Sequence, residues 1–173
     1  MAEIVMTTHP APTVHDALHA EPGQDRHFAV CALGGTYRTL AEARRFTATT
    51  LGEWGIHASV VSDATLVVSE LVSNALRHAA PARTATDTAT EGPASDVPCV
   101  AWLALAHEDT GVLCAVSDSS RTPPALVPSD PCADSGRGLW IVDRISESWG
   151  WTPPDALGKT VWAQLPASGP AGE

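Results

Sequence analysis

The sequence predicts an α/β fold: a two-layer sandwich with a mixed, mainly antiparallel sheet of about five strands and about three helices on one face. Segments with apolar residues at helical spacing predict the helices, and short alternating or apolar runs bounded by turn residues predict the strands. About three helices are too few to cover both faces of a five-stranded sheet, and we therefore expect all of them on one side.

The N-terminal half predicts one strand and then two helices. Residues 27–33 form a short apolar run that ends at paired glycines, as expected of an edge strand. Residues 39–54 have helical spacing, and Gly55 stands where a C-terminal cap belongs. A longer helical pattern, residues 58–79, ends before Pro81.

The C-terminal half predicts an antiparallel hairpin, a helix and two last strands. They are expected at residues 100–107, 112–118, 139–145, 149–152 and 160–165. Residues 119–135, between the hairpin and the helix, are rich in proline and lack periodicity, so they are a candidate lid over a ligand.

The 173 residues suit one domain with a real core, which we expect at residues 26–166. Residues 1–25 contain three prolines and little apolar periodicity, which predicts a flexible N-terminal tail. Residues 167–173 predict a C-terminal tail. Residues 81–98 are small, polar and rich in proline, which predicts a flexible loop.

Charge and composition exclude several functions. The net charge is −10 and the basic residues form no cluster, which argues against direct binding of nucleic acid. The sequence lacks an uninterrupted apolar run of membrane-spanning length and a recognisable secretory signal, so we expect no membrane contact and a cytoplasmic location. The four cysteines and seven histidines are scattered, which disfavours a zinc site.

Glu70, Asn74 and His78 recur every four residues within an apolar helical pattern, so they share one edge of the predicted helix. A carboxylate there could orient or deprotonate a nucleophile, and the amide oxygen of Asn74 is a suitable ligand for Mg²⁺. A solvated helix face with an incidental asparagine is the alternative.

Two further segments could contact a ligand. Asp118 ends a predicted strand, where its carboxylate could accept a hydrogen bond from an exocyclic amine such as adenine N6; a turn residue is the alternative. Gly136, Arg137 and Gly138 precede a predicted helix, so backbone N–H groups and a permanent positive charge could meet phosphate there. An ordinary loop-to-helix turn would look the same.

The sequence Gly158-Lys159-Thr160 resembles the end of a phosphate-binding P-loop only superficially. Pro153 stands where that motif needs its first glycine, and the residues after Thr160 alternate as a strand rather than forming a helix. We therefore exclude a P-loop.

Taken together, four segments in order resemble the nucleotide-binding boxes of the gyrase and histidine-kinase type ATPase superfamily. They are Glu70 to Ala75 with His78, Val116 to Asp118, Gly136 to Leu139, and Gly158 to Trp162. Within the superfamily, the chain over about residues 27–165 most resembles the small stand-alone anti-sigma-factor serine/threonine kinases and related ATP-binding regulators of actinobacteria. A histidine kinase would also need a helical phospho-acceptor domain, for which residues 1–26 are too short and too rich in proline.

The resemblance implies roles for these residues. Glu70 would be the general base, Asn74 would coordinate Mg²⁺, and Asp118 would bind adenine N6, with Thr160 supporting the base through Asp118 or a water. The remaining box residues, Gly136, Arg137, Gly138 and Leu139, would line the phosphates of ATP, with His78 nearby. Ser120 stands where the family usually has glycine.

The resemblance also implies partners: a sigma factor and a small antagonist protein that the kinase phosphorylates. It allows a homodimer. An interaction module that binds its partner without phosphoryl transfer is the alternative, with or without bound ATP.

Overall fold

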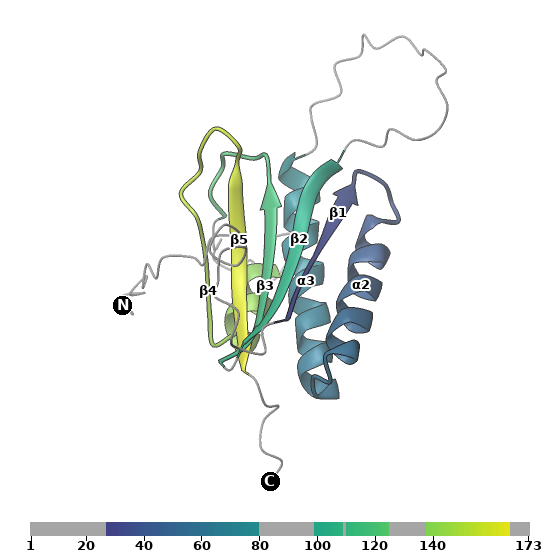
Figure 1. Ribbon diagram of the computed structural model, residues 1–173. Coiled ribbons are helices and arrows are strands. Elements are labelled where there is room, and N and C mark those ends of the chain that lie inside the picture. The colour runs from purple at the N-terminus through teal and green to yellow at the C-terminus, as the bar shows by residue number, and fades with distance from the viewer. Residues whose placement is uncertain (1–26, 80–98, 109, 125–137, 167–173) are drawn as a thin grey trace, which may run out of the picture.

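The computed structural model describes residues 27–79, 99–108, 110–124 and 138–166, which form a sheet with helices on one face (Figure 1). The elements in order are β1 (His27–Gly34), α2 (Thr39–Glu53), α3 (Ala58–Ala79), β2 (Cys99–Glu108), β3 (Gly111–Asp118), α4 (Gly138–Ile145), β4 (Ser148–Trp151) and β5 (Lys159–Pro166). The predicted tails and the 81–98 loop lie outside the described residues, as does most of the predicted lid.

The described strands form one sheet in the order β1-β2-β3-β5-β4, and every neighbouring pair is antiparallel. The sequence allowed a mixed sheet. The parallel contact is avoided because α4 carries the chain from β3 to the edge strand β4, and β5 then returns between them. Thus β3 and β4, which run in the same direction, do not pair.

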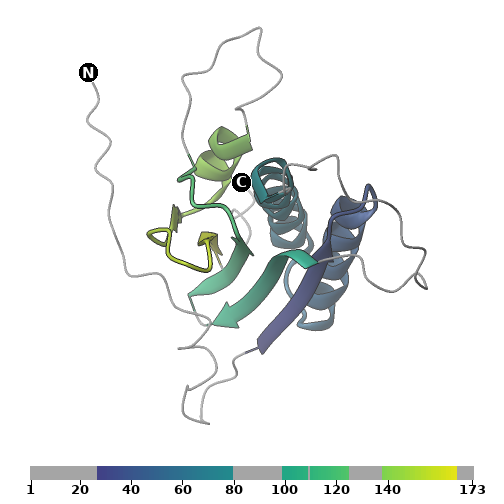
Figure 2. The same ribbon diagram turned by 90° about the horizontal axis from the view of Figure 1, so that it is seen from above.

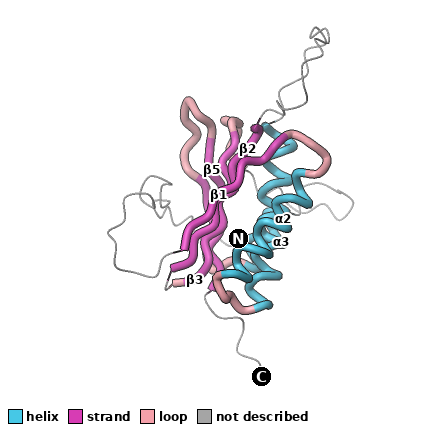
Figure 3. Tube along the Cα trace, turned by 45° about the vertical axis from the view of Figure 1, so that its right-hand side comes forward, coloured by secondary structure: helices cyan, strands magenta, loops and turns pink. Residues whose placement is uncertain are grey.

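The helices all lie on one side of the sheet, which confirms the predicted two-layer sandwich (Figures 2 and 3). The long helix α3 packs over β3, β2 and β5, while α2 packs against α3 and β1. By length and composition α3 could cross a membrane. In this fold its apolar side chains instead form the core, with Val67, Val68 and Val72 fully buried.

Alternation along the strands separates the core from the open face of the sheet. Leu103 and Leu105 of β2 and Val116 of β3 face the helices and are almost completely buried. Trp102, which precedes Leu103, faces the other side and is 52% exposed. Burying an aliphatic side chain of this size contributes about 1.5–3 kcal/mol, so this row accounts for much of the driving force for folding.

The predicted C-terminal cap of α2 is confirmed at Gly55. Its φ of 74° lies in the left-handed region, and its N–H donates to the carbonyl of Gly52. Ile56 N–H then bonds to the carbonyl of Leu51, which turns the chain into α3.

Cys114 lies fully buried in β3, and burial raises the pKa of its thiol to about 12. It therefore stays protonated at neutral pH, as expected of an inert core residue. Cys114 is a free thiol.

The backbone just before β5 lies in close contact with the end of β3. Gly158 has a φ of 117°, and a Cβ atom added to it would lie 1.9 Å from the carbonyl oxygen of Asp118. Only glycine fits this position.

We expect Gly158→Ala to lower the free energy of unfolding by about 2–4 kcal/mol, because the new methyl group adds a steric clash to an unfavourable φ. Urea unfolding followed by circular dichroism measures this loss. Gly52→Ala is the control: a Cβ there meets nothing within 4 Å, and a gain of about 0.5–1 kcal/mol is expected. Equal effects of the two substitutions would contradict the steric explanation.

Candidate functional site

Glu70 and Asn74 lie on the polar edge of α3, next to its buried apolar side. Both are half-buried, whereas the neighbouring Leu71 and Val72 are in the core. The two polar side chains therefore border the core instead of facing open solvent, as predicted from their spacing.

The start of α4 lies against Glu70. A Cβ atom on Gly138 would be 2.6 Å from Oε2 of Glu70, so the glycine allows the backbone to approach this carboxylate closely. Leu139 and Val142 hold α4 in place because both are buried where it packs against α3. A solvated face does not explain this contact. The carboxylate of Glu70 instead meets a helix N-terminus, where backbone N–H groups favour negative charge.

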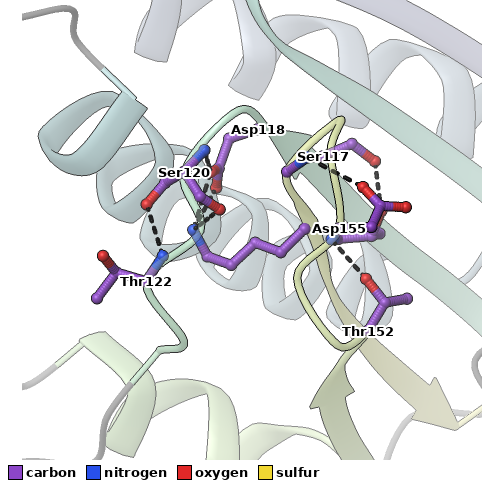
Figure 4. A network of polar contacts seen from close by, with 9 residues as sticks. Ser117, Asp118, Ser120, Thr122, Thr152 and Asp155 are labelled. Atoms are coloured by element: carbon purple, nitrogen blue, oxygen red, sulfur yellow. Dashed lines mark hydrogen bonds and ion pairs between the residues drawn. The ribbon is translucent and has the colours of Figure 1, made fainter.

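Asp118 is a buried charged residue at the end of β3, with 6% of its surface exposed. Its Oδ1 accepts a hydrogen bond from Ser120 N–H at 2.7 Å, so the turn that was the alternative interpretation is present (Figure 4). The same carboxylate also forms an ion pair, and both interactions hold it in one orientation.

Lys159 is the partner in that ion pair. Its Nζ lies 2.8 Å from Oδ1 and 3.1 Å from Oδ2 of Asp118, and both side chains are buried. Sequence reasoning missed this residue, although a signal was present. Side chains alternate along β5, so Lys159 lies on the same face as Val161 and Ala163, which are in the core. A lysine on that face needs a partner for its charge.

The hydrogen bonds that the structure shows for Thr160 go to Ser117 and Thr152, so of the two predicted ways of supporting the base, through Asp118 or through a water, the second stays open. Oγ1 of Thr160 lies 2.7 Å from Oγ of Ser117, and the N–H of Thr160 donates to Oγ1 of Thr152 (Figure 4). The cause is strand alternation: Thr160 is opposite Ser117 and Lys159 is opposite Asp118, so the two pairs lie on different faces.

A pocket of about 490 Å³ opens at this end of the sheet. Its walls include Asp118 and Lys159 together with Ser117, Thr160 and the loop before β5. This volume is typical of sites for small ligands. Glu70 and Asn74 do not line it, so the described residues form two polar groups: one at the sheet end and one between α3 and α4.

The remaining predicted residues are only partly placed. Gly136 and Arg137 lie outside the described residues, and so does the side chain of His78. In the described ranges, His, Cys, Asp and Glu side chains do not gather in threes that could hold a metal ion. A magnesium ion at Asn74 would thus take most of its ligands from phosphate and water, as this ion usually does.

Comparison with known proteins identifies the family. Residues 35–165 match the histidine kinase-like ATPase domain. The chain belongs to this family. The match spans the segments that carry Glu70, Asp118, Gly138 and Lys159, and confirms the resemblance inferred from the four boxes.

The fold also matches a solved structure, the RsbU and RsbW domains of Rv1364c from Mycobacterium tuberculosis. The TM-score is 0.57 and the sequence identity 22%, over 84% of this chain. The match covers 34% of the length of that chain, and at this sequence identity it shows the fold alone. None of the curated proteins compared with this chain matches it.

We expect Lys159→Met to lower the free energy of unfolding by about 3–5 kcal/mol, because it leaves the carboxylate of Asp118 buried and unpaired. The double substitution Asp118→Asn with Lys159→Met is expected to recover most of this loss, since no lone charge remains. Urea unfolding of the two variants tests this. A double variant no more stable than the single one would show that the lost charge pairing is not the cause.

Proposed function

We propose that this ATPase domain is a Mg-ATP-dependent regulator of the anti-sigma-factor type, a serine/threonine protein kinase that phosphorylates a small antagonist protein and sequesters a sigma factor. The contact between Glu70 and the start of α4, one helical turn from Asn74, supports this most directly. It gathers a base, a magnesium ligand and a helix N-terminus, which are the groups that phosphoryl transfer needs.

In this proposal Glu70 is the general base. Its carboxylate accepts the proton of a serine or threonine hydroxyl on the partner, the hydroxyl oxygen attacks the γ-phosphorus, and the bond to the ADP oxygen breaks. The N-terminus of α4, with Gly138 and the flanking Gly136 and Arg137, binds the phosphates. Buried Leu139 anchors that end of the helix.

Asn74 is the proposed magnesium ligand, through its amide oxygen. It lies one turn after Glu70 on the same half-buried edge, which suits a hard cation shared with phosphate oxygens. Magnesium would supply neutralisation of the phosphate charge, which matters in a chain of net charge −10. His78 is assigned to the phosphate end by the resemblance.

At the other end of the site, Asp118 is the proposed acceptor for adenine N6. The hydrogen bond from Ser120 and the ion pair with Lys159 fix its carboxylate at the pocket wall. Thr160 lines the same pocket and would support the base through a water, since its own hydroxyl is paired with Ser117.

The partner proteins are proposed from the anti-sigma type itself, and a cytoplasmic location follows from them. We further propose that residues 26–166 form the single domain. A homodimer is supported by the sheet face away from the helices, where Phe28, Val30 and Trp102 are 38%, 43% and 52% exposed. Apolar groups gathered on one face favour association.

We expect Glu70→Gln to reduce transfer of labelled phosphate from ATP to an antagonist protein by about 10²- to 10⁴-fold, because the amide cannot accept the proton. The affinity for Mg-ATP, measured by titration calorimetry, should change little. Glu42→Gln, which alters an exposed carboxylate on α2, is the matched control and should transfer normally.

The outcomes separate the two functions. Nucleotide binding without transfer, the same in the wild type and Glu70→Gln, would favour an interaction module over a kinase. A wild type that does not bind Mg-ATP would contradict the ATP-dependent proposal.

We expect Asn74→Ala to weaken ATP binding about tenfold or more in the presence of Mg²⁺, and to leave binding in EDTA unchanged, because it removes one ligand of the cation. Asn74→Asp keeps an oxygen ligand and should retain the dependence on Mg²⁺. If Asn74→Ala binds Mg-ATP like the wild type while its circular dichroism is native, the assignment of Asn74 is wrong.

A further inference from the structure

The ion pair between Lys159 and Asp118 is unusual for this chain. Lys159 is the only lysine in the 173 residues, yet its side chain is just 5% exposed. Lysine is among the residue types least often buried. A buried ion pair also seldom adds stability compared with an apolar pair of similar volume. Stability alone therefore does not account for its presence.

The position of the pair suggests a ligand. Both residues line the pocket of about 490 Å³ at the end of the sheet. The ammonium has three N–H donors, and its Nζ lies within hydrogen-bonding distance of both carboxylate oxygens, at 2.8 and 3.1 Å. The remaining contact, to the carbonyl oxygen of Ser120, is 3.5 Å long and therefore weak. If the ammonium donated a hydrogen bond to a ligand, only this weak contact with Ser120 would be lost.

The two residues bring different hydrogen-bonding groups to the pocket. The carboxylate of Asp118 only accepts, and the ammonium of Lys159 only donates. Adenine offers the complementary pair on its Watson–Crick edge, where N6 donates and N1 accepts. Guanine offers the reverse at the same two positions, because O6 accepts and N1–H donates.

We propose that Lys159 is a base-recognition residue: its Nζ donates to adenine N1 while Asp118 accepts from N6. This rests on the proposed binding of ATP and extends it, because it makes the ion pair, and not Asp118 alone, the element that selects adenine. The hydroxyls of Thr160 and Ser117 are paired with each other, whereas the ammonium of Lys159 is the donor in direct contact with Asp118.

The test compares ATP with 1-deaza-ATP, which keeps the N6 amine and the ring shape but replaces N1 with C–H. Wild-type protein should bind 1-deaza-ATP about tenfold or more weakly, as expected for the loss of a charged hydrogen bond. In Lys159→Met the two nucleotides should bind with equal affinity. Titration calorimetry in Mg²⁺ buffer measures all four affinities.

A second measurement needs no variant. Because the chain has a single lysine, protein labelled with ¹⁵N-lysine has one side-chain ammonium signal in its NMR spectrum. ATP should shift this signal, whereas 1-deaza-ATP should shift it far less. This keeps the proposal testable if Lys159→Met fails to fold.

The outcomes distinguish this inference from the proposed function. If the wild type binds ATP and 1-deaza-ATP equally well, the assignment of Lys159 is wrong and ATP binding stands. If Lys159→Met binds ATP more tightly than the wild type, the lysine competes with the base for Asp118, which also overturns the inference. If the wild type binds no ATP, both proposals fall.

Discussion

The antiparallel register between β3 and β5 is the constraint on which the sheet end of the site depends. It places Lys159 opposite Asp118 and Thr160 opposite Ser117. Because side chains alternate, a shift of β5 by one residue would turn Lys159 to the open face, away from Asp118, and Thr160 toward the core. The close approach of Gly158 to the backbone of Asp118 fixes this register, since a shifted strand would lose the one position that lacks a side chain.

The helix α3 joins this sheet end to the second polar group. Its apolar side covers β3 and supplies much of the core, while Glu70 and Asn74 stay half-buried along one edge. One rigid helix thus fixes the position of Glu70 relative to the core, and α4 packs against it through Leu139 and Val142. A carboxylate held in this way cannot relax far into solvent, which suits a group that has to meet a phosphate and a hydroxyl in one geometry.

Much of the fold could be predicted from local patterns. The predicted helices agree with α2, α3 and α4 to within one residue at each end, and Gly55 caps α2 as expected. The shared edge of Glu70 and Asn74 also followed from spacing alone. The pairing of Lys159 with Asp118 did not, because the two residues are 41 positions apart and meet only once the register of β3 and β5 is known. The pairing of Thr160 with Ser117 depends on the same register, which the sequence of β5 alone does not define.

The burial of the single lysine also affects how the protein reacts with reagents that modify amines. The positive charges that the described residues offer to solvent come from arginine, because the ammonium of Lys159 is enclosed with Asp118. A lysine becomes reactive toward acylating reagents only when its amine is accessible. The rate of acylation measured at Lys159 therefore reports how often its side chain leaves the ion pair with Asp118, and so measures local stability at the β3–β5 end of the sheet.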